Sequence, residues 1–408
     1  MRMMRSYRNA LLSCALVTSV ASGCTANTTS RWVPQPSAHT QERPSQTARI
    51  SGVHVTEIPI PSGIDAAPVI VSVSGAGNVY FGSFDANPPV LPMSYCYALP
   101  GGSCPNPGFW MGSYAGGTFT RVSPQGADGV PCANGPGNCC PATPQNGCRA
   151  GQVSAIDAKD FPSIVWASEY DYFYSTQPGF PWGELEYGAS GTASVPPPQY
   201  DPNLGLGGSA VITSIVAAAD GRMWIGGGGP TGATGNPATL PSSYYGESNS
   251  DQLLLTRGPH RHVWGLTHRS ASESVVFEFA PKGSVLHAFT IPSYVAHISG
   301  NAHAVWFTDF GRNAIGKMDG DGNVTEYAIP TNRSGAFDLA IAPDQSVWFT
   351  ESSADKVGRL KPNGTITELP LPTPNAVPAG IDATVSGCAR PAIWVGEIGP
   401  MQLAQIRY

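Results

Sequence analysis

Residues 305–330 read VWFTDFGRNAIGKMDGDGNVTEYAIP, and residues 347–372 read VWFTESSADKVGRLKPNGTITELPLP. The two stretches align without a gap, with Val347 in the place of Val305. Each contains an apolar Trp-Phe-Thr segment, an Ile-Gly-Lys or Val-Gly-Arg segment, and a Thr-Glu segment that ends in proline, and each segment has the composition of a short strand. An internal repeat of this period is typical of a repeat architecture, so it decides the fold class.

Tight turns separate these segments. The turns at 319–322 (DGDG) and at 362–364 (PNG) suit β-hairpins, because Gly and Asn tolerate positive φ. A fourth segment precedes each tryptophan segment, at 295–299 and at 337–342. Four strands in roughly 40 to 45 residues are the unit of a β-propeller blade. The repeat therefore predicts an all-β propeller built of four-stranded antiparallel blades.

Seven segments of the tryptophan type predict seven blades. Their central residues are Tyr80, Trp166, Trp224, Trp264, Trp306, Trp348 and Trp394. The steps between them are long before Trp224, and we attribute the excess to insertions at about 87–148, at 170–182 and, further on, at 226–250. An eighth, degenerate blade inside the longest step is the alternative. Each tryptophan is expected to pack between neighbouring blades.

The segment VHVTEIPIP at 53–61 matches the last strand of the repeat, although it precedes the first blade. The final repeat, which runs from Trp394 to Tyr408, lacks such a strand. We therefore expect residues 55–59 to pair beside residues 403–407 and to complete the last blade, because this pairing removes two exposed sheet edges. The propeller domain then spans residues 51–408.

The composition agrees with this fold and narrows the partners. Charged residues make up 12% of the 408 residues, whereas Gly (48) and Pro (39) are plentiful, as in an all-β protein with many turns. A net charge of −6 and a pI near 5.7 argue against nucleic acid as a partner. We expect a monomer that binds a small molecule, a glycan or a protein at the propeller face.

The N-terminus has the features of an export signal. Arg2, Arg5 and Arg8 precede a short apolar core at 10–21, and the phrase Ala-Ser-Gly-Cys at 21–24 resembles the lipobox of bacterial lipoproteins. We expect a signal peptide at 1–23, lipidation of Cys24 and a flexible tether at 24–50. The chain would then be lipid-anchored in the bacterial cell envelope, in the outer membrane, the periplasm or at the cell surface. An ordinary secretory signal is the alternative.

The cysteines agree with export. Six of the nine crowd into one stretch, and in an oxidising compartment disulfides are the default expectation. They are Cys96, Cys104, Cys132, Cys139, Cys140 and Cys148. A zinc site is the alternative, although neither a nearby histidine nor a paired CxxC spacing supports it. Cys388 is expected to be a buried thiol.

The repeated phrase, with WFT[DE] followed by [IV]G[RK][ML] and [IV]TE[YL], resembles the repeat of the virginiamycin B lyase (streptogramin lyase) family. The resemblance is strong over 305–376 and extends weakly over 53–408, and it implies a seven-bladed propeller. Enzymes of this family linearise cyclic depsipeptide antibiotics of the streptogramin B type by elimination at the lactone ester. This chemistry needs a magnesium ion on the ester carbonyl and a base for the neighbouring proton.

The resemblance also implies histidines in the innermost strands, within Pro-His-Ala-Ile and Glu-Pro-His-Gly phrases. The comparable phrases here are VAHI at 295–298, DLAI at 338–341 and PAGI at 378–381. The places of the histidines are taken by Ala296, Leu339 and Ala379. His297 falls one position late, where strand alternation turns it to the opposite face. The alignment therefore lacks the catalytic bases of the lyases.

Acidic residues favour a metal site more than the histidines do. The residue three positions after each central residue is, in order, Ser83, Glu169, Gly227, Thr267, Asp309, Glu351 and Glu397. The last three belong to successive blades, and the carboxylate of Glu397 takes a place that resembles the metal ligand of the lyases. Such oxygen ligands suit Mg²⁺ or Ca²⁺. Ion pairs of these acids with Lys317, Lys356 or Arg359 are the alternative.

Two functions of different classes follow. The first is a binding or scaffold module, which the missing histidines and the tether favour. The second is a metal-dependent lyase acting on a cyclic ester or lactone, which the acid series favours. A weaker metal candidate is the His260-Arg261-His262 turn, with His268 nearby, for which a surface turn is the simpler interpretation.

Overall fold

The structure is a computed structural model, and it describes most of the propeller. The described residues are 45–50, 52–62, 64, 67–82, 90–91, 111–122, 148–149, 152–159, 164–170, 185–189, 212–219, 223–227, 253–281, 283–384 and 391–408. Within them the chain is all-β, apart from one turn of 3₁₀ helix at Pro259–Arg261. No helix in this part of the chain is long and apolar enough to cross a bilayer.

The strands form eight antiparallel sheets in the described residues. Sheet by sheet, they are β1 (Gln46–Ile50), β2 (Val53–Pro59), β28 (Gln402–Arg407), β27 (Ile393–Glu397) and β26 (Pro378–Ala383); β3 (Ile70–Val73), β4 (Val79–Gly82), β6 (Met111–Ala115) and β7 (Thr118–Val122); β9 (Gln152–Asp157), β10 (Ile164–Tyr170) and β11 (Leu185–Ala189); β12 (Ile212–Ala217) and β13 (Met223–Gly227); β14 (Leu254–Arg257), β15 (Val263–Ser270), β16 (Glu273–Phe279) and β17 (Val285–Ile291); β18 (Val295–Gly300), β19 (Val305–Asp309), β20 (Ala314–Met318) and β21 (Val324–Ala328); β22 (Ala336–Ile341), β23 (Val347–Glu351), β24 (Lys356–Leu360) and β25 (Ile366–Pro370); and β5 (Val90–Leu91) and β8 (Cys148–Arg149).

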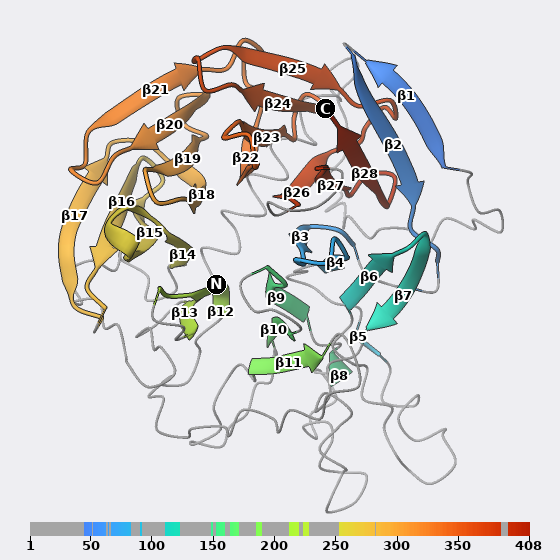
Figure 1. Cartoon of the computed structure of the whole chain (residues 1–408), viewed down its shortest axis with the longest axis horizontal. Helices are drawn as coiled ribbons and strands as arrows, with labels where there is room; N and C mark the ends of the chain where they lie inside the picture. The colour runs from blue at the N-terminus through green and yellow to red at the C-terminus, as the bar shows by residue number, and fades with distance from the viewer. Residues whose placement is uncertain are drawn as a thin grey trace, which may run out of the picture.

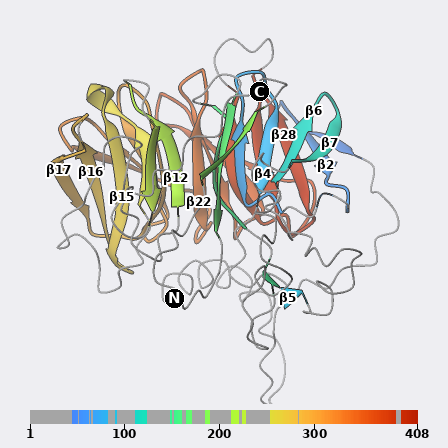
Figure 2. The same cartoon turned by 90° about the horizontal axis from the view of Figure 1, so that it is seen from below.

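Seven of these sheets lie around a common axis (Figure 1). Their first strands contact one another in the order β3, β9, β12, β14, β18, β22, β26 and back to β3, which closes an inner ring. Strands such as β17, β21, β25 and β7 lie on the outside, and in the side view the strands run between the two faces (Figure 2). The all-β propeller prediction is confirmed, and the closed ring is consistent with seven blades.

Ring closure follows the predicted pairing. Strand β2 lies antiparallel to β28, with Val55 opposite Ile406 and Pro59 opposite Gln402. The blade has an additional outer strand, because β1 pairs with β2. The sequence assigns residues 46–50 to the flexible tether, whereas the structure places them in a strand of the last blade.

The glycine of the repeated Ile-Gly-Lys and Val-Gly-Arg segments has a packing role. In β20 and β24, a Cβ added at Gly316 or Gly358 would lie 2.0 Å from the ring of Phe307 or Phe349 on the neighbouring strand. Such a separation is far inside van der Waals range, so both of these blades need a residue without a side chain there. The Trp-Phe segment and the glycine of the next strand are therefore one structural unit.

The threonine of the Trp-Phe-Thr segment joins adjacent blades. The Thr308 hydroxyl accepts a hydrogen bond from the His297 backbone N–H at 3.0 Å and donates to the carbonyl of Phe337 in the next blade at 2.9 Å. Thr350 repeats this arrangement with Asp338 at 3.1 Å and with Ala379 at 2.9 Å. In these two blades a buried hydroxyl thus satisfies the irregular start of the inner strand.

In two blades the glutamate of the Thr-Glu segment anchors the linker that enters the blade. The Glu368 carboxylate accepts hydrogen bonds from both the backbone N–H and the hydroxyl of Thr331, at 2.7 Å each. Glu57 in β2 binds Thr373 in the same way, at 2.9 and 2.6 Å. The misplaced N-terminal segment therefore performs the role that the repeat assigns to its last strand.

Three of the tryptophans belong to hydrophobic clusters that span two blades, as predicted. Trp264 packs with Phe307 of the following blade, and Trp348 packs with Ile381 of the blade after its own. Trp394 packs with Val71 across the closure of the ring. All three indoles are at most 3% exposed, so their role is structural.

The predicted insertion at 87–148 is wrong in its middle part. Strands β6 and β7 are the third and fourth strands of the first blade, and β6 pairs with β4. Gly116 and Gly117, with φ of 58° and 90°, form the turn between them, and Met111 is fully buried. The hairpin is missed in the sequence because the Gly-, Pro- and Cys-rich stretches around it hide its alternating pattern.

Other predictions fall outside the described residues. They concern the signal peptide at 1–23, the lipidation site Cys24, most of the tether at 24–50, most of the insertions at 170–182 and 226–250, the thiol of Cys388, and the clustered cysteines Cys96, Cys104, Cys132, Cys139 and Cys140. The sixth clustered cysteine, Cys148, lies in β8, which pairs with β5. The disulfide prediction stays a prediction.

Candidate functional site

Charged side chains of the innermost strands meet at the axis of the ring. His297 in β18 and Asp338 in β22 form an ion pair, with Nδ1 2.8 Å from Oδ1, and both side chains are partly exposed. Asp338 also accepts hydrogen bonds from the backbone N–H groups of Leu339 at 2.7 Å and Ile381 at 3.0 Å. This carboxylate therefore connects three consecutive blades.

A second pair lies where the last blade meets the first. Asp382 in β26 accepts a hydrogen bond from the Val73 backbone N–H at 2.8 Å and forms an ion pair with Lys159 Nζ at 2.6 Å. Lys159 follows β9 of the second blade, so this carboxylate also joins three blades. Asp338, Asp382 and Lys159 do not stand out in the sequence, although Asp338 occupies the repeat position of His297.

The chemistry available at the axis follows from these contacts. Burial would lower the pKa of the His297 imidazole, but the charge and hydrogen bond of Asp338 outweigh it and raise the pKa above its usual value. An imidazole whose pKa is raised holds its proton to a higher pH, so less of it is in the neutral form that could remove a proton from a substrate. His297 is thus suited to binding an anionic or hydrogen-bond-accepting group more than to removing a proton.

The three predicted metal ligands occupy one repeat position in three blades. Asp309, Glu351 and Glu397 are the last residues of β19, β23 and β27, and none is exposed. Among the described residues, one group brings three metal-type ligands within 4.8 Å of one another, and these acids are not part of it. A cation shared by the three carboxylates stays a prediction.

The surroundings of Glu351 and Glu397 favour their protonated forms. Burial, together with the charge of Glu368 beside it, raises the pKa of Glu351 to about 8. Burial and the charge of Glu57 raise the pKa of Glu397 to about 8, although the Gln402 side chain donates a hydrogen bond to it at 2.7 Å. Both side chains are therefore largely neutral carboxylic acids at neutral pH, which are poor ligands for Mg²⁺ or Ca²⁺.

Asp309 differs because it has more polar neighbours. Its Oδ1 accepts hydrogen bonds from the Ser293 hydroxyl and from the Arg312 backbone N–H, and the Arg312 guanidinium lies 3.7 Å from Oδ2. Burial still outweighs these contacts and raises the pKa of Asp309. Asp309 is thus held by hydrogen bonds and charge from residues of neighbouring loops.

The alternative was that Lys317, Lys356 or Arg359 forms ion pairs with the three acids. The described residues show other partners for these cations. Lys356 pairs with Glu368 at 3.0 Å, and Arg359 pairs with Asp344 at 2.5 Å. Lys317 lies over the ring of Trp306, 5.3 Å from its centroid. These cations satisfy other groups in their blades, which leaves the buried acids without a paired lysine.

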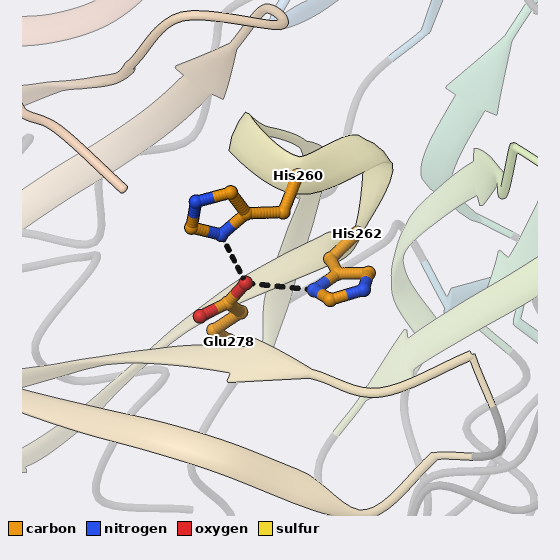
Figure 3. A group of neighbouring side chains, drawn as sticks. All are labelled: His260, His262 and Glu278. Atoms are coloured by element: carbon orange, nitrogen blue, oxygen red, sulfur yellow. Dashed lines mark hydrogen bonds and ion pairs between the residues drawn. The ribbon is translucent and has the colours of Figure 1, made fainter. Parts of the chain in front are cut away.

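The group of metal-type ligands is His260, His262 and Glu278 (Figure 3). Both imidazole Nδ1 atoms lie on one carboxylate oxygen of Glu278, at 2.8 Å from His260 and 2.7 Å from His262. His287 Nδ1 lies 2.7 Å from the second oxygen. Burial would raise the pKa of Glu278, but the hydrogen bonds from the three histidines lower it below its usual value, so it is ionised.

Only half of this cluster is evident from the sequence. The His260-Arg261-His262 turn stands out, whereas Glu278 and His287 do not. His268 is separate from it: the ring is buried and its Nε2 lies 2.7 Å from the carbonyl of Val295. The pairing of Glu278 with His287 across two strands is a matter of register, which carries no local signal in the sequence.

Comparison with known sequences covers the C-terminal half of the chain. Residues 207–408 match the virginiamycin B lyase family. This half of the chain belongs to that family. No curated protein matches the chain.

Solved lyase structures have a fold similar to that of most of the chain. A catalytically inactive variant of virginiamycin B lyase from Staphylococcus aureus with quinupristin is similar with a TM-score of 0.53 and 18% identity, over 87% of this chain and 99% of that one. A streptogramin B lyase structure gives 0.54 and 18% over 87% and 97%. YCF48 bound to D1 peptide gives 0.50 and 13% over 86% and 94%. At these identities the likeness concerns the fold.

The strand pairing in this structure corrects one position in the sequence alignment with the virginiamycin B lyase repeat. Ile298, Leu339 and Ile381 face Phe307, Phe349 and Val395 in their blades, so they are equivalent. The residue two before each of them is Ala296, Phe337 and Ala379. Phe337, and not Leu339, therefore takes the second place of a family histidine; the loop before Val347 is one residue longer than its counterpart, which shifts the alignment.

Proposed function

We propose that this member of the virginiamycin B lyase family is a binding or scaffold module and not a lyase. The observation that supports this proposal most directly is the identity of three inner-strand residues. Ala296, Phe337 and Ala379 have no side chain that can take up a proton, and they stand where the resemblance to the lyases implies histidines. An elimination needs a base within hydrogen-bond reach of the substrate.

The remaining polar groups at the axis support binding. His297 and Asp338 satisfy each other, and so do Asp382 and Lys159. Preorganised charged pairs that keep part of their surface exposed are suited to recognising a polar ligand. A solved structure of similar fold, YCF48 bound to D1 peptide, holds a peptide, which makes a peptide-like ligand a reasonable candidate.

The first test is a lyase assay. The purified chain, incubated with quinupristin and millimolar Mg²⁺, should leave the cyclic depsipeptide intact, because Ala296, Phe337 and Ala379 supply no base. Mass spectrometry does not separate ring-opening by elimination from intact drug, since the mass is unchanged, so liquid chromatography is the readout. A linear product that forms only with Mg²⁺ and the purified chain would overturn the proposal.

A second candidate is a metal-dependent lyase for a cyclic ester or lactone. The observation in its favour is the His297–Asp338 pair, because a carboxylate orients an imidazole in many general bases. If ring-opening occurs, His297→Ala should abolish it, whereas His303→Ala, at an exposed loop position, should leave it unchanged. Full activity in both variants would point to a contaminating enzyme.

We also propose that the chain is exported and lipid-anchored through Cys24. A Cys24→Ala variant should move from the membrane fraction to the soluble fraction, because it lacks the thiol that carries the lipid. A Cys14→Ala variant is the matched control, since Cys14 lies in the signal that is removed, and it should stay with membranes. Mass spectrometry of the N-terminal peptide should show acyl groups on Cys24; an unmodified Cys24 in membranes would contradict this proposal.

A further inference from the structure

We propose that His260, His262 and Glu278 bind a divalent transition metal ion of the zinc class, with His287 positioning the carboxylate. This site lies in the fourth blade, away from the axial pairs, and it is independent of the proposed function. Its ligands come from the turn before β15 and from the facing strand β16, while His287 is on β17.

The donor atoms already converge. The Nδ1 atoms of His260 and His262 point at the same oxygen of Glu278, and all three ligand atoms lie within 4.8 Å of one another. A zinc ion about 2.0 to 2.2 Å from each donor would fit between them after a small outward shift of the rings. The ring carbons and Nε2 atoms point away from the carboxylate (Figure 3), so they do not obstruct that position.

Proton balance at the site is simple. In the metal-free form each Nδ1 donates its proton to Glu278. On metal binding each ring would bind through the Nδ1 lone pair, so its proton leaves Nδ1, and the neutral ring carries one on Nε2. Any proton in excess of one per ring is released to solvent, and the carboxylate stays ionised.

The donor set selects the class of ion. Two imidazole nitrogens and one carboxylate oxygen suit Zn²⁺ and neighbouring transition metals, whereas Mg²⁺ and Ca²⁺ require mainly oxygen ligands. Three protein ligands would leave one tetrahedral position for water or another group. This site is thus a different candidate from the Mg²⁺ or Ca²⁺ site that the acid series predicts.

The protein holds these groups in place from several sides. Glu278 is 1% exposed, and its second oxygen is fixed by His287. His260 and Arg261 adopt φ of 59° and 60°, a left-handed backbone that is costly for residues with side chains. The ring of His260 also lies against the next blade, since a Cβ at Gly320 would be 2.7 Å from its Nε2.

Titration calorimetry on the full chain, stripped with chelator and then given Zn²⁺, tests the site. One equivalent should bind in the micromolar range or tighter, and a His260→Ala, His262→Ala double variant should lose that equivalent. His287→Ala should keep it with roughly 10- to 100-fold weaker affinity, as expected for a residue that orients a ligand. His303→Ala, an exposed histidine outside the cluster, is the matched control and should bind as the unchanged chain does.

Two further measurements distinguish a site of histidines and carboxylate from a site of cysteines. Co²⁺ in place of Zn²⁺ should give a spectrum without a thiolate charge-transfer band, because the ligands are nitrogen and oxygen; a strong thiolate band that persists in the histidine variants would assign the ion to cysteines instead. Gly320→Ala, which pushes on His260 from the next blade, should weaken binding while the fold is kept. Unchanged stoichiometry and affinity in the folded double variant, or a cluster that responds to pH but binds no Zn²⁺, overturns the proposal.

Discussion

A chain shortened to begin at Ile60 should lose most of its resistance to denaturant, whereas one that begins at Gly52 should keep it. The first truncation removes both β1 and β2, and the second removes β1 alone. Strand β2 supplies the outer strand beside β28 and buries Val55, Glu57 and Ile58. Its loss exposes the edge of β28 and leaves the linker residue Thr373 without the carboxylate that binds it.

The magnitude should be several kcal/mol. Burial of a large aliphatic side chain contributes about 1.5 to 3 kcal/mol, and β2 buries two of them in addition to its ladder of hydrogen bonds. Guanidinium unfolding followed by circular dichroism should show the difference in midpoint between the two truncations. Equal midpoints would mean that the last blade is stable without its N-terminal strand, which contradicts the closure described above.

Replacing Glu351 by glutamine should reduce the decrease in the free energy of unfolding that occurs as the pH rises above neutral. Neither carboxyl oxygen of Glu351 has a hydrogen-bond partner among the described residues, and the pKa is raised from 4.5 to about 8. The folded state therefore binds a proton that the unfolded chain releases above pH 4.5. The stabilisation is complete below that pH and is lost as the pH rises through about 8.

This linkage amounts to roughly 4 to 5 kcal/mol over that interval, since one pKa unit corresponds to about 1.4 kcal/mol. The Glu351→Gln variant has a neutral side chain of nearly the same shape at every pH, so it should match the unchanged chain at about pH 5 and exceed it at about pH 9. Glu273→Gln, at a surface ion pair with Arg269, is the control. Parallel curves of unfolding free energy against pH for all three proteins would show that Glu351 is ionised in the folded state.

Much of the fold could be predicted because its elements repeat. The Trp-Phe-Thr segments and their glycine partners perform the same hydrogen-bonding and packing tasks in both copies of the repeat, so two such copies were enough to identify the unit. The same reasoning located the partner of β28 in the N-terminal segment at 53–59. It failed at Met111–Val122, where the blade departs from the repeat phrase.

The candidate sites were harder to predict, because they depend on contacts between strands. One extra residue in the loop between β22 and β23 moved the position of a family histidine from Leu339 to Phe337. Glu278 meets His287 only through the pairing of β16 with β17, and it meets His260 only because the turn before β15 folds back over that pair. No spacing in the linear sequence encodes these encounters.

The pairing of β2 with β28 has a consequence for how the molecule is made. Its partners His54 and Arg407 stand near opposite ends of the propeller sequence. Bringing such distant segments together costs about 5 kcal/mol of loop-closure entropy, so this step should come late in folding. Until it occurs, both segments offer unpaired edges, and the β2 segment of one molecule can occupy the place beside β28 of another. Refolding at high protein concentration should then yield domain-swapped oligomers, in competition with the closed monomeric ring.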